Sequence, residues 1–440
     1  MMPLGNANCV ALPMMCRENR SSASGVRDSM SIPVPLAGLF RHRPLLLLIT
    51  ARGLSEFAFQ IATVALGWQV YAITDSVLAI GMIGLVGFLP TALLVFLAGH
   101  IADRYDRRRV VQVCQTVEAI IGVFLAWGSF GGWLTVPEIF GCVALLGVVV
   151  AFDGPAGSAI LPAVAPEGMV QRATSLSTGV FQLGSICGPA LGGFAYAIAP
   201  GVPYALIAVC GLASAVLMAA VKLERHVVSN ERPTFEALFA GIGFVRRNPA
   251  ILGTISLDLF AVLLGGATAL LPVYARDILH TGPLGLGILR GAPAVGALIM
   301  TAVLARHALK TRVGLRMFQA VIVFGAATVL FAVSQLIWLS VIALLIMGAA
   351  DTVSVVIRWS LVQLSTPDDM RGRVGAVNFL FINASNQLGE FESGVVAALA
   401  GAMPAAVIGG IGTIAIALLW MKLFPALRNI ERLEPDENAA

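Results

Sequence analysis

Three ionisable residues lie inside long apolar stretches of this sequence, where a charge is poorly solvated. Arg52 and Glu56 stand four residues apart, which places both side chains on one face of a helix. Asp258 lies in a second apolar stretch. A charge near the centre of a bilayer costs about 2.5 to 3.5 kcal/mol on insertion scales, so each such group is a candidate functional site. Arg52 and Glu56 either form a structural ion pair, or Glu56 gains and loses a proton while Arg52 favours its charged form in one state.

Polar residues also recur at helical spacing within the apolar sequence. Asn383, Gln387 and Glu390 share one stretch, and Arg290 lies in another. The stripe predicts a polar helix face that lines a cavity or contacts a neighbouring helix. We expect Arg290 to bind an anionic group of a small molecule or to pair with one of the acids. Trp68 is a further candidate for the cavity wall, although aromatic residues in such stretches more often serve packing.

The cysteines and histidines are not spaced for catalysis or metal binding. None of the six cysteines forms a CxxC or zinc-type pattern, which predicts neither disulfides nor a metal site. The five histidines lie in or beside loops without a carboxylate or nucleophile at catalytic spacing. There is no GxxxxGK[ST] motif for ATP, and a net charge of +4 gives no argument for nucleic acid. We therefore expect no enzyme, no cofactor and no nucleic-acid partner.

The composition indicates a membrane protein. Only 12% of the 440 residues are charged and 58% are hydrophobic, whereas a soluble domain carries about 25% charged residues. A bilayer core needs about 20 apolar residues per helix, and this spacing predicts an all-α integral membrane protein with twelve transmembrane helices. The expected spans are Pro44–Tyr71, Val77–Ile101, Val110–Phe130, Val136–Ile160, Ala173–Ala199, Val202–Val221, Ile251–Ala275, Gly285–Ala305, Met317–Ser334, Ile337–Val362, Val374–Ala400 and Met403–Phe424.

The positions of the basic residues predict the orientation of these spans. Arg276 is the only Lys or Arg in a loop after an odd-numbered span, and Arg52, Arg290 and Arg358 lie within spans. The others among the 28 Lys and Arg residues lie in the two tails, in loops after even-numbered spans or at the end of the last span. Because Lys and Arg are retained on the cytoplasmic side, we expect both termini to be cytoplasmic.

The second half of the chain repeats the first. The tripeptide Val-Tyr-Ala at 70–72 recurs at 273–275, and PEGMVQR at 166–172 aligns with PDDMRGR at 367–373. The order of the matches predicts two pseudo-symmetric six-helix bundles, a duplication that places a substrate path between the halves. The expected domains are a partly disordered cytoplasmic tail at 1–43, a bundle at 44–221, a cytoplasmic loop at 222–250, a second bundle at 251–424 and a cytoplasmic tail at 425–440.

The repeat relates several of the ionisable residues. Asp258 falls at the position of Ser55, next to Glu56, so spans one and seven are expected to present carboxylates from both halves to one cavity. Asp153 and Asp351 are also equivalent, near the cytoplasmic ends of spans four and ten, where a gate or a helix cap is the expected role.

Two other ionisable residues have expected structural roles. Arg358, seven residues after Asp351, shares its helix face and can extend its head group to the interface. Glu118 in span three is expected to have a structural partner.

The sequence GHIADRYDRRR at 99–109 separates spans two and three. It predicts a tight helix exit into a cytoplasmic turn, with Asp103 near a helix end and four arginines able to pair with it or with lipid phosphate. An alternative is that the arginines serve only as an orientation signal.

Span five contains GSICGPALGG at 184–193. Gly184, Gly188 and Gly192 form a stripe at four-residue spacing that permits close helix contact, and Pro189 removes a backbone hydrogen bond, which predicts a kink. Ordinary glycine packing between spans is the alternative.

These motifs resemble those of the major facilitator superfamily over nearly all of 41–424. The loop is similar to the superfamily motif G-x-x-x-D-R-x-G-R-[RK] but carries Asp106 where the motif has glycine. The matching positions are Gly99, Asp103, Arg104, Arg107 and Arg108. The stretch containing Gly184, Gly188, Pro189, Gly192 and Gly193 resembles the motif associated with antiporters. AITDS, ADRYDRRR and DGPAGSAILPAVAP resemble the branch of siderophore and drug efflux proteins.

The resemblance implies alternating access, in which the halves rock about a central cavity and an inward proton drives an outward substrate. The expected function is export of a siderophore or lipophilic drug by proton antiport, in a monomer of the bacterial inner membrane. In this scheme Glu56, Asp258 and Arg52 couple the proton, and the 99–109 loop with Asp153 and Asp351 forms the gate. A proton-coupled uptake symporter of the same fold and a membrane lipid-handling protein are the alternatives.

Overall fold

The computed structural model describes residues 42–166, 168–221, 242–307 and 311–431. The expected tail at 1–43, the loop at 222–250 and the end of the chain at 432–440 fall wholly or largely outside these residues. The described residues form helices and turns, without a strand. Ten of the helical segments are long and apolar enough to cross a membrane, which agrees with an all-α membrane protein.

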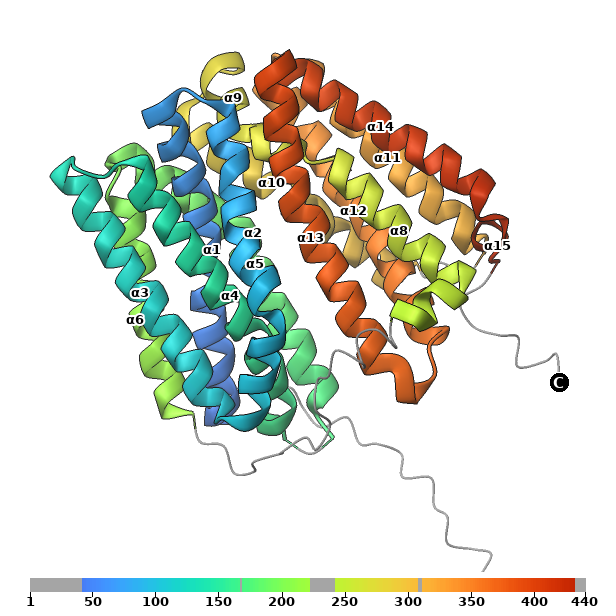
Figure 1. The fold of residues 1–440 in the computed structure, drawn as a ribbon, viewed down its shortest axis with the longest axis horizontal. Coiled ribbons are helices and arrows are strands. Elements are labelled where there is room, and N and C mark those ends of the chain that lie inside the picture. Colours follow the sequence, from blue (N-terminus) through green and yellow to red (C-terminus); the bar gives the residue numbers. More distant parts are fainter. Residues whose placement is uncertain (1–41, 167, 222–241, 308–310, 432–440) are drawn as a thin grey trace, which may run out of the picture. The chain divides into compact units, whose positions relative to one another are not determined.

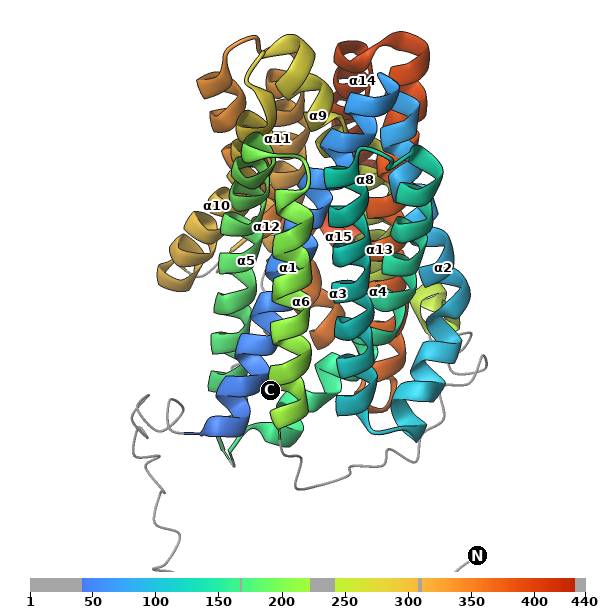
Figure 2. The same cartoon turned by 90° about the vertical axis from the view of Figure 1, so that its left-hand side faces the viewer.

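The first group of helices follows the order of the chain. Its members are α1 (Arg43–Thr74), α2 (Val77–Arg104), α3 (Arg107–Gly131), α4 (Val136–Val164), α5 (Val170–Ile198) and α6 (Val202–Ala220). α1 packs against α5 and α6, while α3 packs against α4 and α6 and α2 packs against α4. Figure 2 faces this group and shows α6, α3 and their neighbours side by side.

The second group repeats this packing. Its long helices are α8 (Pro249–Leu264), α10 (Gly282–Arg306), α11 (Val313–Val333), α12 (Ile337–Leu364), α13 (Asp368–Ala400) and α14 (Ala402–Leu423), and the short α15 (Pro425–Arg428) follows. α8 packs against α13 and α14, α11 against α12 and α14, and α10 against α12. Each of these pairs has its counterpart in the first group, so the repeat in the sequence is also a repeat of helix contacts (Figure 1).

The seventh expected span, Ile251–Ala275, is not one continuous helix. α8 ends at Leu264 and is followed by the 3-10 turn η2 (Ala267–Leu270), the short α9 (Leu271–Val273) and the π-helical turn η3 (Tyr274–Ile278). The break falls at Gly265 and Gly266, where a Cβ on Gly266 would collide with the backbone of Gly389 in α13. Close backbone packing between small residues therefore interrupts the helix that apolarity alone predicts.

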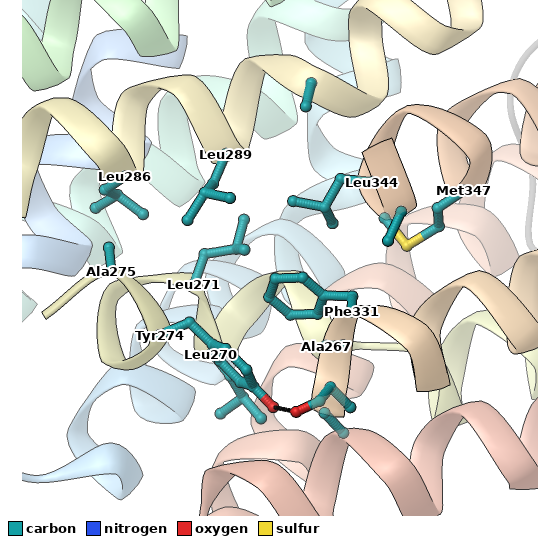
Figure 3. Packing of buried hydrophobic residues seen from close by; sticks show 14 of the residues in the cluster. Ala267, Leu270, Leu271, Tyr274, Ala275, Leu286, Leu289, Phe331, Leu344 and Met347 are labelled. Atoms are coloured by element: carbon teal, nitrogen blue, oxygen red, sulfur yellow. Dashed lines mark hydrogen bonds between the residues drawn. The ribbon is translucent and has the colours of Figure 1, made fainter. Parts of the chain in front are cut away.

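Large apolar side chains close the core around this interrupted segment. Tyr274 and Phe331 are fully buried with their ring centroids 4.5 Å apart. The Tyr274 hydroxyl donates a hydrogen bond of 2.9 Å to the carbonyl oxygen of Ala332, shown dashed in Figure 3. Leu289 and Leu344 pack in the same cluster, so the segment joins α10, α11 and α12 in one apolar core.

Two crossings join the helix groups, α2 with α13 and α5 with α10. Both crossings depend on glycine. A Cβ at Gly193 of α5 would lie 3.0 Å from the Cα atom of Gly287 in α10, and a Cβ at Gly394 of α13 would lie 2.6 Å from the Cα atom of Gly81 in α2. The absence of side chains lets the backbones approach closely at each crossing.

Candidate functional site

A cavity of about 360 Å³ lies between the two helix groups. This volume falls at the lower end of the range for small-molecule sites. The wall contains residues of α1, α2 and α4 on one side and of η2, α10 and α13 on the other. Its polar lining residues are Gln60, Thr63, Thr91, Arg290, Asn383, Asn386, Gln387 and Glu390.

Both charged residues of this wall come from the second helix group. Arg290 of α10 and Glu390 of α13 lie within electrostatic range of each other. The Nε atom of Arg290 is buried without a hydrogen-bond partner among the described residues. An unsatisfied buried donor is costly, so Arg290 retains unused capacity to bind an acceptor group.

The carboxylate of Glu390 lies at the crossing of α13 with α2. A Cβ at Gly84 of α2 would lie 3.1 Å from Glu390 Oε2 and 2.8 Å from the carbonyl oxygen of Gln387. Glycine at this position therefore leaves room for the Glu390 carboxylate. This wall contains Asn383, Gln387, Glu390 and Arg290, all of which the sequence assigned to the cavity.

The opposite wall is mainly apolar. Phe59, Leu66, Ile80, Ile83 and Leu146 line it from α1, α2 and α4. A molecule held here meets hydrocarbon on one side and amides and charges on the other. The geometry suits an amphipathic organic molecule rather than a simple ion.

Trp68 is not part of the cavity lining, which corrects the sequence assignment. Its ring meets that of Tyr196 edge-on, with centroids 6.4 Å apart, and packs against the apolar cluster around Leu286 and Phe331. Its face of α1 is turned toward α5 and the core, so packing is its role in this structure.

Arg52 pairs with Asp153 of α4 at 2.9 Å rather than with Glu56 on its own helix. A Cβ at Gly157, one turn along α4, would collide with the Arg52 guanidinium. The pairing therefore depends on glycine at 157 as well as on Asp153. The i to i+4 spacing of Arg52 and Glu56 shows that they can meet, but the closer acid lies across the bundle.

Glu56 is held by neutral donors. Gln60 Nε2 donates to Glu56 Oε1 at 2.7 Å, and Ser185 Oγ of α5 donates to the same oxygen at 3.3 Å. Gln60 also lines the cavity, whereas Glu56 is not among the lining residues. Gln60 therefore connects the Glu56 carboxylate to the cavity wall.

Asp258 does not share a cavity with Glu56, contrary to the expectation for spans one and seven. Its carboxylate forms an ion pair with Arg358 of α12, and both side chains are only 10% exposed. The pair lines a separate cavity of about 20 Å³ together with Asp351. Arg358 turns inward toward Asp258 because an uncompensated buried carboxylate is costly, instead of extending to the interface.

A charged cluster that the sequence did not predict joins α1 to η3. Arg276 lies 2.7 Å from Asp75, donates to the carbonyl oxygen of Tyr71 at 3.3 Å and stacks over the Tyr71 ring at 5.1 Å. The Tyr71 hydroxyl donates to Asp277. Two signals were available, the repeated Val-Tyr-Ala tripeptide and the isolated position of Arg276, but neither identifies the partner across the halves.

Comparison with known proteins places this architecture in a family. The pattern of the transmembrane secretion effector family, MFS_3, matches residues 35–439. The chain belongs to this family. It is therefore a transporter of the major facilitator superfamily, a multi-pass membrane protein rather than an enzyme.

Two relatives of this MFS_3 chain are similar over most of their length. The enterobactin exporter EntS of Salmonella choleraesuis (strain SC-B67) is 26% identical over 416 residues, which cover 92% of this chain and 98% of the relative. The multidrug efflux pump Tap of Mycobacterium bovis (strain BCG / Pasteur 1173P2) is 26% identical over 404 residues, or 88% and 95% of the two chains.

Solved structures show the same fold. The nucleoside transporter NupG has a TM-score of 0.63 at 16% identity and covers 87% of this chain and 99% of its own. A D-xylose-proton symporter has a TM-score of 0.66 at 15% identity, with coverage of 87% and 98%. At these identities the likeness is one of fold alone.

The loop of the MFS_3 chain between α2 and α3 is tight despite the departure from the superfamily motif. Asp106 caps α3 by accepting a hydrogen bond of 3.0 Å from the backbone N–H of Arg108, a role that acidic side chains fill at helix starts. The guanidinium of Arg108 donates to the carbonyl oxygen of Val221 at 2.8 Å, after the end of α6.

The side chain of Asp103 lies outside the described residues. The other residues assigned to this part of the gate lie near the ends of α2 and α3: Gly99, Arg104 and Arg107.

The antiporter-type stretch of the MFS_3 chain lies on α5 and faces two helices. A Cβ at Gly184 would lie 2.7 Å from Glu56 Cγ, and a Cβ at Gly188 would lie 2.6 Å from Gln60 Cβ. Gly192 contacts α1 in the same way, whereas Gly193 contacts α10. α5 continues as a helix through Pro189. The glycine stripe therefore packs directly on the part of α1 that carries Glu56 and Gln60.

Proposed function

We propose that this chain exports a small organic molecule, a siderophore or a lipophilic drug, across the bacterial inner membrane in exchange for protons. The observation that carries the proposal is the cavity between the helix groups, with its apolar wall and its opposite wall of amides and charges. A transporter that alternates between two sides needs such a site between parts that move relative to each other. The names of the relatives, an enterobactin exporter and a multidrug efflux pump, support the direction and the class of cargo.

The proposal includes twelve spans with both termini in the cytoplasm. α5 and α13 are not among the ten apolar segments, but each lies at a crossing with the other helix group, α5 through glycines and α13 through glycines and the polar residues of the cavity wall. α13 loses apolarity because it faces the cavity. The distribution of basic residues supports the orientation. The bundles at 44–221 and 251–424 are the two rocking halves of a monomer.

Proton coupling is proposed at Glu56, with Arg52 as the cation that alternates between Asp153 and Glu56. Glu56 is connected to the cavity through Gln60 and to α5 through Ser185. A change in the contact of α1 with α4 would release Arg52 from Asp153 to the carboxylate on its own helix face. Asp258 is the corresponding carboxyl of the second half, held by Arg358.

The test uses purified protein in liposomes of inverted orientation with an imposed pH gradient. A catechol siderophore and a lipophilic cationic dye are the two cargo probes. Glu56→Gln is expected to abolish gradient-driven transport while leaving expression and substrate exchange without a gradient intact. Glu138→Gln, which removes a carboxylate from the exposed start of α4, serves as the control.

Unchanged gradient-driven transport by Glu56→Gln would remove Glu56 from the mechanism. Accumulation of the cargo in right-side-out vesicles under an inward proton gradient would show that the chain is a proton-coupled uptake symporter and not an exporter. Failure of both probes to be transported by the unaltered chain would contradict the proposed cargo.

A further inference from the structure

We propose that Glu118 of α3 is a second proton-holding carboxyl of this transporter, part of one acid cluster with Glu56 and Asp153. The inference rests on the proposed proton-coupled export. The sequence predicts only a structural partner for Glu118, and the structure supplies one. Ser55 Oγ donates a hydrogen bond of 3.0 Å to Glu118 Oε2.

A hydroxyl partner does not neutralise the carboxyl. Glu118 is only 4% exposed, and no Lys, Arg or His of the described residues lies within ion-pair distance of it. A buried carboxylate without a cation is strongly disfavoured, and a bound proton removes that charge. The neutral carboxyl keeps its hydrogen bond with the Ser55 hydroxyl.

The surroundings of Glu118 contain more acids than cations. Glu56 of α1 and Asp153 of α4 lie within electrostatic range of Glu118. Arg52 is the one guanidinium paired within this group of described residues, and it contacts Asp153 at 2.9 Å. The second carboxylate oxygen of Asp153, Oδ1, is buried and has no hydrogen-bond partner within the part of the chain that the structure describes. Arg52 balances one of the three carboxyls, and Glu118 has no cation within ion-pair distance among the described residues.

Among the described residues, the remaining helices packed against α3 supply no positive charge to Glu118. α6 presents Cys210, and α3 itself presents Cys114 one turn earlier, both within electrostatic range. Neither thiol can act as a counter-ion. The proton on Glu118 is therefore controlled by the α1 and α4 groups alone.

α1 connects Glu118 to the coupling residue. Ser55 and Glu56 are adjacent on α1, with Ser55 bonded to Glu118 of α3 and Glu56 bonded to Ser185 of α5. In the structure, Arg52 is paired with Asp153 and the Glu118 carboxyl, without a cation, holds its proton. When the α1–α4 contact opens and Arg52 moves to Glu56, water reaches Glu118, its O–H bond breaks, the proton passes to water, and the carboxylate remains. When Arg52 returns to Asp153, the carboxyl takes up a proton again. Proton release by Glu118 is thus tied to the α1–α4 contact.

The experiment measures the protonated carboxyl directly. Infrared spectra of the full chain in lipid discs, recorded across pH without substrate, report the C=O stretch of protonated acids. We expect a band that disappears in Glu118→Gln, persists in Glu138→Gln, and changes with pH in the unaltered chain. Ser55→Ala keeps the carboxyl and is expected to shift the frequency of the same band.

A transport measurement separates a cycling proton from a fixed one. Proton release on adding cargo to purified Glu118→Gln is expected to fall by about half relative to the unaltered chain, because Glu56 still releases its own proton, while cargo exchange without a gradient is retained. A Glu118 band that does not respond to pH or cargo, together with unchanged proton release in Glu118→Gln, would overturn the proposal. Because the infrared titration needs no cargo, failure of the export proposal would leave its result unaffected.

Discussion

Among the described residues that line the cavity, Arg290 is the one with a buried side-chain donor that makes no hydrogen bond. Its buried Nε has no hydrogen-bond partner among the described residues, and Glu390, which lies within electrostatic range, belongs to the same cavity wall. A hydrogen bond from a charged group contributes about 1.5 to 3 kcal/mol, or roughly 10- to 150-fold in affinity. Arg290→Gln is therefore expected to weaken binding of a cargo with an anionic or acceptor group by about that factor.

The measurement is the Kd of a catechol siderophore, compared with that of an apolar dye without an acceptor group. Arg306→Gln, at the end of the same helix, is the matched control and should leave both values unchanged. An equal loss for both cargoes would assign Arg290 to the structure of α10 instead of to cargo recognition.

At the residue scale the sequence predicted where polar side chains lie better than which groups they contact. The polar stripe of α13 lines the cavity as its helical spacing indicated. The partner of Arg52 could not be predicted, because Asp153 is 101 positions away and reaches it only when α4 packs on α1. Trp68 was assigned to the wrong surface because α1 is largely apolar around its circumference, so its sequence does not show which face meets the cavity.

At the scale of elements, one ion pair joins the first and fourth helices of each half. The arginine is on the first helix in one half and on the fourth helix in the other. Arg52 of α1 meets Asp153 of α4, whereas Asp258 of α8 meets Arg358 of α12. Removing one partner of a buried pair costs about 3 to 5 kcal/mol because the other charge is left unpaired. Arg358→Ala should therefore lower the stability of the protein by about that amount, measured by thermal unfolding in detergent.

The exchanged pair Asp258→Arg with Arg358→Asp provides the control for this loss. It restores opposite charges between α8 and α12 and should recover most of the stability. A double variant no more stable than Arg358→Ala would show that packing of the Arg358 side chain, rather than its charge, holds the two helices together.

The glycine stripe of α5 allows a second prediction about helix contact. A Cβ at Gly188 would lie 2.6 Å from Gln60 Cβ, whereas a Cβ at Gly179 on the same helix has open space around it. Gly188→Ala should force α5 away from α1 at a cost of about 1 to 3 kcal/mol and reduce transport. Gly179→Ala should be neutral or stabilising by up to about 1 kcal/mol. Equal transport and equal unfolding temperatures for the two variants would contradict direct packing of the stripe on α1.

The sequence predicted most of the helices because each one is a continuous apolar stretch bounded by charged residues. It failed at α8, where the run from Ile251 to Ala275 continues through Gly265 and Gly266 without loss of apolarity. What stops the helix there is the backbone of α13 at Gly389, a contact between segments more than a hundred residues apart. Hydropathy contains no information about such a contact.

At the scale of the whole molecule, the halves meet through close crossings and through the charged cluster at the end of α1. Gly81, Gly193, Gly287 and Gly394 lie at the crossings. The charged cluster was not anticipated, because loops between spans carry orientation signals but not partners. Among the described residues this cluster joins the halves at the end of α1, and a contact of this kind differs between the two conformations of the proposed rocking.

That cluster yields a prediction about the conformational equilibrium. The Tyr71 hydroxyl contacts Asp277, and Arg276 pairs with Asp75 while stacking on the Tyr71 ring. These contacts join the two helix groups beside the start of α2, whereas the 99–109 loop lies at its other end, and the proposed rocking must break them to separate the groups there. Arg276 and Asp75 are partly exposed, so each contact contributes at most about 1 kcal/mol. A combined loss of about 1.4 kcal/mol would change the ratio of the two conformations tenfold.

Arg276→Ala together with Tyr71→Phe should therefore populate the state that is open on that side. The measurement is the rate at which a single cysteine, introduced at Thr63 of the cavity wall, reacts with a membrane-impermeant thiol reagent. His307→Ala, at an exposed position after the end of α10, is the control and should leave the rate unchanged. An unchanged rate in the double variant would show that the glycine crossings alone hold this end closed.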